Sequence, residues 1–128
     1  MADALFDTTT FIDYYRGYEG ARTLIESAVS GRVAASYSPF SVFELWIRPM
    51  ERSEELEYLA LLSLFEEAPL TRGVAQLAAL WLRGESRLSR QRLIGDALIA
   101  ATAAVRDEPI YTRNERDFAR FGVRVRSY

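Results

Sequence analysis

The chain has 128 residues, 49% of them apolar, and a formal net charge of −2. This length allows one compact domain, 1–128, and is too short for two. No apolar stretch approaches the roughly 18 residues that span a bilayer, and the first residues carry neither a basic leader nor a cleavage site. We therefore expect a soluble, cytoplasmic protein with no membrane contact.

Three residue types that often serve as catalytic groups are missing, because all 16 basic residues are arginine and the chain has no lysine, histidine or cysteine. A Walker-type phosphate loop needs its lysine, a Ser-His-Asp or Cys-His site needs its histidine, and Schiff-base chemistry needs an amine. Zinc bound by cysteine and histidine is excluded as well. The main chemistry left is a cluster of carboxylates that binds Mg²⁺ or Mn²⁺.

The first half of the chain predicts two short strands, each followed by helices. The predicted strands are 4–6 and 33–36, and the predicted helices are 8–15, 19–29, 39–49 and 54–65. In the second helix the apolar residues recur with helical spacing, and Gly31 follows where a C-terminal glycine belongs. Pro39 suits the first turn of the third helix, because its missing N–H would be unpaired there, and Glu44 falls in the middle of that helix.

The second half predicts strands at 68–70, 110–112 and 123–127. Thr71 is the expected N-cap of a helix, which an arginine-rich loop at 83–92 follows. A second helix is predicted to begin at Gly95 and Asp96, and the polar segment 113–117 is predicted to be a turn. Strands that alternate with helices indicate an α/β sandwich with a mostly parallel sheet, in which ligands bind at the carboxyl ends of the strands.

Four acids lie where a site at this edge of the sheet would need them. Asp7 follows the first strand, but an aspartate there could also be an ordinary N-cap. Glu44 stands between two large apolar residues, an unusual setting for a solvated glutamate. At Asp96 capping and metal binding predict the same position, and Asp117 follows a strand with the polar Thr112 nearby. Position alone leaves both interpretations open.

Four motifs follow one another along the chain: LFDTTTFID, SVFEL, GDALIAATA and YTRNERDF. In this order they resemble the PIN-domain ribonucleases, and most closely the VapC-like toxins of bacterial and archaeal toxin–antitoxin pairs. The resemblance covers essentially the whole chain, and DALIAATA followed by TRNERDF is its specific part. It implies a PIN-like three-layer sandwich with a mostly parallel sheet of four to five strands. It also implies a Mg²⁺- or Mn²⁺-dependent endoribonuclease that leaves a 3′-hydroxyl and a 5′-phosphate.

The resemblance implies roles for individual residues as well. The implied metal-binding and catalytic acids are Asp7, Glu44, Asp96 and Asp117. The polar residues that would support these acids by hydrogen bonds are Thr8, Thr9 and Asn114. Separately, arginine offers a planar head with several donors for phosphate groups, and a solvated surface charge is the alternative at each position. The candidates for RNA binding are Arg92, Arg113 and Arg116.

The resemblance further implies two protein partners, a cognate VapB-like antitoxin that approaches the acidic pocket and a second copy of the chain in a homodimer. Tyr14, Tyr15 and Trp46 could contact the antitoxin, although aromatics at helical spacing more often belong to the core. Asp13 is expected to be an ordinary exposed residue or to face the antitoxin.

Two other functions remain open on the sequence. A phosphotransfer enzyme could use Asp7 as its nucleophile, but such enzymes typically need a second aspartate two residues later, where this chain has Thr9, and a lysine, which it lacks. The other is a degenerate PIN-fold binding module without nuclease activity. The presence of all four acids counts against that second alternative.

Overall fold

The computed structural model describes residues 3–128, which form five strands and seven helices. The strands are β1 (Ala4–Phe6), β2 (Ala35–Tyr37), β3 (Glu66–Glu67), β4 (Ile110–Tyr111) and β5 (Val125–Arg126). The helices are α1 (Thr8–Tyr15), α2 (Glu19–Val29), α3 (Pro39–Trp46), α4 (Arg52–Leu62), α5 (Arg72–Leu82), α6 (Arg87–Arg106) and α7 (Glu115–Ala119).

The five strands form one sheet in the order β3-β2-β1-β4-β5, and every pairing between neighbours is parallel. In the central strand, Leu5 pairs with Ser36 of β2 and with Ile110 of β4. Since neighbouring parallel strands end at the same edge of a sheet, the residues that follow β1 and β4 come close together there. The predicted α/β sandwich with a mostly parallel sheet is confirmed.

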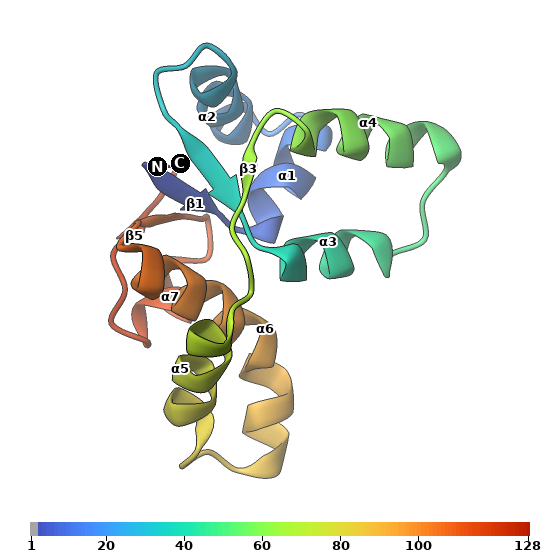
Figure 1. Ribbon diagram of the computed structural model, residues 1–128. Helices are drawn as coiled ribbons and strands as arrows, with labels where there is room; N and C mark the ends of the chain where they lie inside the picture. The colour runs from blue at the N-terminus through green and yellow to red at the C-terminus, as the bar shows by residue number, and fades with distance from the viewer. Residues whose placement is uncertain (1–2) are drawn as a thin grey trace.

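Helices cover both faces of the sheet (Figure 1). Side chains of a strand point alternately to its two faces, and β1 supplies both layers of the core. Phe6 packs with the α1, α2 and α4 side, where Phe11, Leu24 and Tyr58 are buried. Leu5 points the other way and packs against α6, β4 and α7 through Ile99, Ile110 and Phe118.

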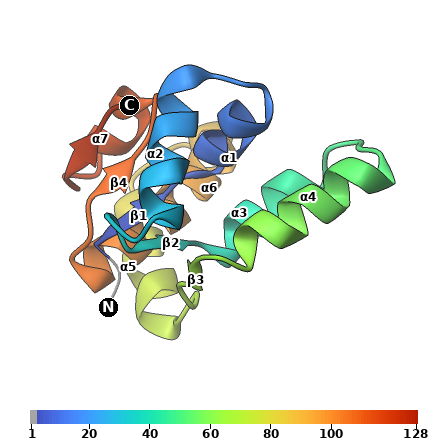
Figure 2. The same cartoon turned by 90° about the horizontal axis from the view of Figure 1, so that it is seen from above.

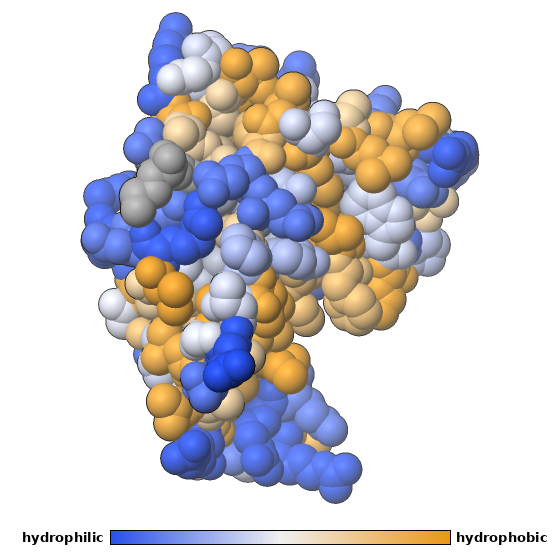
Figure 3. Space-filling view, viewed as in Figure 1, coloured by the Kyte–Doolittle hydropathy of each residue, from blue (hydrophilic) through white to orange (hydrophobic). Residues whose placement is uncertain are grey.

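Two helix pairs extend from this body. Helices α5 and α6 pack through small and branched side chains that recur at helical spacing: Val74, Ala78, Leu82, Leu93, Ala97 and Ala101. Helices α3 and α4 extend from another side of the body (Figure 2). The space-filling surface is hollowed between the α3–α4 pair and the α5–α6 pair (Figure 3). Strands β1 and β2 end toward this hollow (Figure 1).

Helix α6 corrects the prediction for the arginine-rich segment. The helix begins at Arg87, and the Ser86 hydroxyl caps it by accepting a hydrogen bond from the amide of Ser89. Much of 83–92 is therefore helix, and Asp96 lies in the middle of α6 rather than at its start. Gly95 resembled a helix boundary in the sequence, but the structure requires it for close packing, which the next subsection describes.

Smaller corrections concern the edges of the sheet. The third strand is Glu66–Glu67 and not 68–70, although Ala68 still donates its amide to the carbonyl of Tyr37. The predicted turn at 113–117 contains most of the short helix α7. Other boundaries shift by a few residues, as element ends usually do. In the part of the chain that the structure describes, each helix is too short or too polar to cross a membrane.

Candidate active site

Asp7 stands at the junction of β1 and α1, with only 2% of its surface exposed. Its Oδ1 accepts hydrogen bonds from the Thr9 hydroxyl at 2.6 Å and from the Thr10 amide at 3.2 Å. Its Oδ2 accepts a hydrogen bond from the Thr112 hydroxyl at 2.6 Å. Asp7 is therefore a helix N-cap, and it is also held from the neighbouring strand, which an ordinary cap does not need.

Two opposing effects act on the charge of Asp7. Burial raises the pKa of its carboxyl, because a charged group loses solvation in the protein. The hydrogen bonds from Thr112, Thr9 and the Thr10 amide oppose this rise, since they favour the ionised form. The carboxylate also lies at the N-terminus of α1, where the helix dipole favours negative charge.

Glu44 reaches the same region from the middle of α3. The Thr8 hydroxyl donates a 2.5 Å hydrogen bond to its Oε1 and lies 2.9 Å from the hydroxyl of Ser41. Because a hydroxyl has a single proton, Thr8 donates to the carboxylate and accepts from Ser41. Burial raises the pKa of Glu44, and the negative charge of Asp7 raises it further, while the bond from Thr8 opposes both.

Close packing between α3 and α6 brings Glu44 near the third acid, Asp96. A methyl group at Gly95 would lie 2.6 Å from Cε2 of Phe40 and 3.5 Å from Oε2 of Glu44. The ring of Phe40 thus occupies the place of the missing side chain. Gly95 permits this approach, and Asp96 follows it directly on α6.

The pKa of Asp96 is affected by the charges of all three other acids. Burial, together with the charges of Asp117, Glu44 and Asp7, raises its pKa to about 6, and Arg120 opposes this only in part. Asp117 itself is exposed on α7. Four segments that are far apart in the sequence therefore place their carboxylates close enough for the charges of three to affect the pKa of Asp96.

Oxygen donors of this kind suit a hard divalent cation, and the excess negative charge around Asp96 favours one. Among residues 3–128, however, no three acidic side chains are gathered tightly enough to enclose a metal ion as they stand. Like charges repel, and Asp96 and Glu44 are only partly buried. A bound cation would have to draw these carboxylates together.

The comparison with known families agrees with this geometry. Residues 4–123 match the PIN domain. The chain belongs to the PIN-domain family. It is 35% identical over 118 residues to Ribonuclease VapC10 of Mycobacterium tuberculosis, an alignment that covers 91% of this chain and 86% of the relative. The family predicted from the four sequence motifs is therefore confirmed.

Solved structures share the same PIN fold. A toxin–antitoxin complex from Klebsiella pneumoniae superposes with a TM-score of 0.70 and 26% identity, over 91% of this chain and 90% of that one. DNA-bound VapBC from Salmonella typhimurium superposes with a TM-score of 0.75 and 22% identity, over 99% of this chain and 98% of that one. This second likeness supports the fold only.

The polar residues predicted around the acids divide into two groups in this PIN domain. Thr9 and Thr8 lie within hydrogen-bonding distance of Asp7 and Glu44. At Asn114 the backbone amide donates to the Thr112 hydroxyl at 2.9 Å, and no side-chain bond caps α7. Thr112 was expected beside Asp117, but its hydroxyl instead bonds to Asp7. The sequence indicated that Thr112 follows a strand, but only the structure shows that this strand pairs with β1.

The candidate arginines also differ from one another. Arg92 and Arg116 are exposed on α6 and α7. Arg113 is engaged with Asp13 in an ion pair of 3.0 Å between Nε and Oδ2. The prediction that Asp13 is an ordinary exposed or partner-facing residue is wrong, because only 3% of it is exposed.

The aromatics predicted to face a partner lie mainly against the core of the PIN domain. Tyr14 and Trp46 are half-buried and pack on the layer that covers Phe6. Tyr15 is the exception, with 42% of its surface exposed. Of the three, Tyr15 therefore offers the most surface to a partner.

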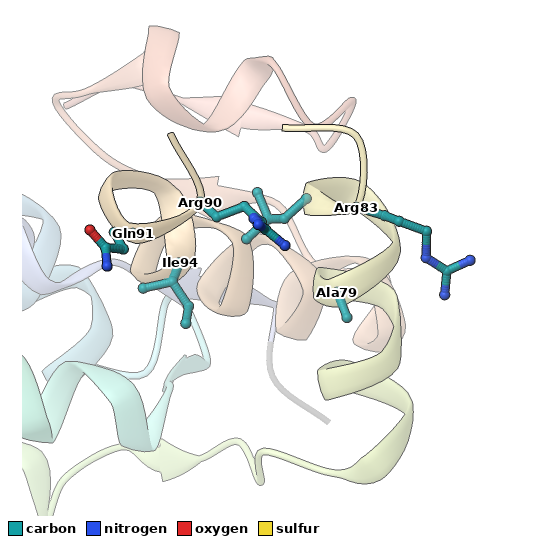
Figure 4. Close-up of a pocket in the computed structure, with 6 residues that line it drawn as sticks. Ala79, Arg83, Arg90, Gln91 and Ile94 are labelled. Atoms are coloured by element: carbon teal, nitrogen blue, oxygen red, sulfur yellow. The ribbon is translucent and has the colours of Figure 1, made fainter. Parts of the chain in front are cut away.

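A separate pocket of about 400 Å³ lies between α5 and α6 (Figure 4). Its lining is Ala79, Leu82, Arg83, Arg90, Gln91 and Ile94. Arg83 points away from the pocket into solvent (Figure 4). Since none of the four acids lines this pocket, it is distinct from the candidate active site.

Proposed function

We propose that this PIN domain, 1–128, is a cytoplasmic, metal-dependent endoribonuclease toxin whose catalytic acids are Asp7, Glu44, Asp96 and Asp117. The observation that carries the proposal is that Asp7, at the carboxyl end of β1, Glu44 and Asp117 all lie near enough to Asp96 for their charges to raise its pKa. The 35% identity to a protein named a ribonuclease supports RNA as the substrate.

The four acids are the groups that would hold Mg²⁺ or Mn²⁺. When bound, such an ion lowers the pKa of a water ligand and offsets negative charge that develops on a phosphate. The protein itself orients the carboxylates that would bind the ion. Asp7 is fixed by bonds to both of its oxygens, and Thr8 fixes one oxygen of Glu44. Asp96 and Asp117 are more open to solvent than Asp7 and are therefore more accessible to an RNA phosphate.

The reaction is hydrolysis of a phosphodiester bond. A water oxygen forms a bond to phosphorus, the bond from phosphorus to the 3′-oxygen breaks, and the products are a 3′-hydroxyl and a 5′-phosphate. The water loses a proton, and the leaving 3′-oxygen gains one. Arg92 and Arg116 are the candidates for holding the RNA phosphates, because both are exposed. Arg113 is a weaker candidate, since Asp13 already binds its guanidinium group.

We also infer that an antitoxin binds this chain and that the chain forms a homodimer. A structure with the same fold and 26% sequence identity is a toxin–antitoxin complex from Klebsiella pneumoniae. The exposed Tyr15 is a candidate for the antitoxin contact.

Cleavage of a structured RNA by the purified protein tests the proposed function. We expect cleavage with Mn²⁺ and none with EDTA. Asp7→Asn and Asp96→Asn should each lower the rate by at least about 100-fold, the upper end of the losses for residues that only orient a metal ligand. The matched control is Asp107→Asn, which changes an exposed acid in a left-handed conformation that asparagine also adopts. An active protein that neither variant impairs would disprove the site. A protein that binds RNA but never cleaves it would instead support the binding-module alternative.

A further inference from the structure

A charged cluster is built around a buried carboxylate on the helix that follows Asp7. Its centre is Asp13 on α1, which is only 3% exposed. The Arg113 guanidinium binds it with two contacts, Nη2 to Oδ1 at 3.1 Å and Nε to Oδ2 at 3.0 Å. The Tyr128 hydroxyl donates a third bond, to Oδ2, at 2.7 Å. A two-pronged contact of this kind fixes orientation as well as distance.

Two aromatic rings, Tyr18 and Tyr128, pack around the side chain of Arg113. The guanidinium carbon lies 4.6 Å from the centre of the Tyr18 ring, within the range of a cation–π contact. The rings of Tyr18 and Tyr128 meet edge to face, with centroids 6.0 Å apart. A side chain at Gly20 would lie 2.9 Å from the backbone carbon of Tyr128, so glycine permits this segment to approach α2. We call Asp13, Tyr18, Arg113 and Tyr128 the Asp13 cluster.

Each partner of Asp7 adjoins the Asp13 cluster. Thr112 precedes Arg113 in the chain, so the arginine fixes the segment that carries the Thr112 hydroxyl. Thr9 and Thr10 lie on the same helix as Asp13, about one turn earlier. Tyr128, at the other end of the chain, reaches the same helix through its hydrogen bond to Asp13.

We propose that Asp13, Arg113 and Tyr128 are positioning residues for the active site. They lock α1 to the segment between β4 and α7, so that Thr9, Thr10 and Thr112 hold Asp7 from both sides. In its link to catalysis this inference rests on the proposed function. None of the three residues needs to touch the metal or the RNA, because each acts through the hydrogen bonds of Asp7.

Variants can separate positioning from simple stabilisation. Removing Arg113 would leave the carboxylate of Asp13 buried without its cation, which would destabilise the whole fold and obscure a specific effect on the site. Asp13→Asn should destabilise the protein less than removing Arg113, because the side chain of Arg113 is 48% exposed and its charge can be solvated by water. Tyr128→Phe removes the hydroxyl alone. The matched control is Asp107→Asn, which breaks an exposed pair between Asp107 and Arg124 at the far end of α6.

Two measurements carry the test. The first is amide hydrogen exchange at Thr10 and Asn114, whose N–H groups donate to Asp7 and to Thr112. The second is the Mn²⁺ concentration that gives half-maximal RNA cleavage. For Asp13→Asn and Tyr128→Phe we expect faster exchange at both amides. We also expect the half-maximal Mn²⁺ concentration to rise by about 3- to 10-fold. Removing a residue that bonds directly to a metal ligand typically weakens metal binding by roughly 10-fold or more, and these two residues act one step further away. Asp107→Asn should change neither.

The outcomes are distinguishable. If both variants lower the melting temperature but leave the two amides and the Mn²⁺ requirement unchanged, the cluster only stabilises the fold and the inference is wrong. If the wild-type protein shows no Mn²⁺-dependent cleavage, the proposed function fails. The exchange at Thr10 and Asn114 then still decides whether the Asp13 cluster holds Asp7 in place.

Discussion

The hydroxyl of Thr112 donates a 2.6 Å hydrogen bond to the buried carboxylate of Asp7, although the two residues lie 105 positions apart in the sequence. Thr112→Val keeps the shape of the side chain and removes the donor. We expect the dissociation constant for Mn²⁺, measured by calorimetry, to rise by about 10-fold, because a residue that orients a metal ligand typically contributes this much or more.

Thr102→Val is the matched control for that change. Thr102 is equally buried, but its hydroxyl donates to the carbonyl of Leu98 within its own helix. Its loss should leave the affinity for Mn²⁺ unchanged. Equal affinities for Thr112→Val and the wild-type protein would mean that Thr112 does not orient Asp7 for metal binding.

Gly95→Ala should disturb the contact between α3 and α6. Alanine is normally favoured over glycine inside a helix by about 1 kcal/mol. Here its methyl group would collide with the Phe40 ring at 2.6 Å, and overpacking typically costs 1 to 3 kcal/mol. We therefore expect a free energy of unfolding, measured in urea, that is equal to or below that of the wild-type protein, and weaker Mn²⁺ binding through displacement of Glu44.

A second substitution tests the cause of that effect. Phe40→Leu makes room for the methyl group, so Gly95→Ala combined with Phe40→Leu should be more stable than Phe40→Leu alone. The control is Gly73→Ala in α5, where the new methyl group would meet only an ordinary contact of 3.8 Å. If Gly95→Ala stabilises the protein as much as Gly73→Ala does, Phe40 does not constrain position 95.

The metal-free protein should lose stability as pH rises through the titration of Asp96. Its pKa is raised from 3.8 to about 6 in the fold, so the folded protein binds this proton more tightly than the unfolded chain does. Unfolding then releases a proton, and the free energy of unfolding falls as pH increases from about 4 to about 6 and is level for this group above that range. Thermal melts across this range should show the decline in the wild-type protein.

Asp96→Asn removes the titrating group and should flatten that decline. Added Mn²⁺ should raise the melting temperature of the wild-type protein more at pH 7.5 than at pH 4.5, because the ion binds the ionised form. A decline of the same size in Asp96→Asn would assign the pH dependence to another group.

A second buried ion pair should matter for stability. Glu108 is 4% exposed and accepts hydrogen bonds from the Ser36 hydroxyl at 2.9 Å and from Nε of Arg106 at 3.1 Å. Arg106→Ala leaves this carboxylate buried without its cation, and we expect a loss of about 3 to 5 kcal/mol in urea unfolding. Arg52→Ala breaks an exposed pair and should cost less than about 1 kcal/mol. Equal losses would show that Glu108 does not depend on its partner.

The sequence predicted the layers of this fold well, because local patterns determine them. Apolar runs, prolines and capping residues mark the strands and helices without knowledge of distant contacts. The start of α6 was missed because Gly95 resembled a boundary, whereas Ser86 caps the helix nine residues earlier in the chain. Two-residue strands such as β3 carry too little periodicity to be placed by pattern.

The order of four acids along the chain predicted Asp7, Glu44, Asp96 and Asp117 as site residues, and the structure places them near enough for the other three charges to raise the pKa of Asp96. It could not identify the burial of Asp13, because the partners of that carboxylate lie 100 and 115 positions away. A single aspartate on a helix looks the same whether it faces solvent or an arginine from another segment. The bond from Thr112 to Asp7 was missed for the same reason, since strand order was not known.

The chemical nature of the cleaved RNA ends tests the metal-dependent mechanism most directly. Wild-type protein and Asp96→Asn would be incubated with an end-labelled RNA in Mg²⁺ and in EDTA, and the product ends would be identified. We predict 5′-phosphate and 3′-hydroxyl ends that form only with Mg²⁺ and only with the wild-type protein. Products with 5′-hydroxyl and 2′,3′-cyclic phosphate ends that form in EDTA would contradict hydrolysis by metal-activated water at Asp7, Glu44, Asp96 and Asp117.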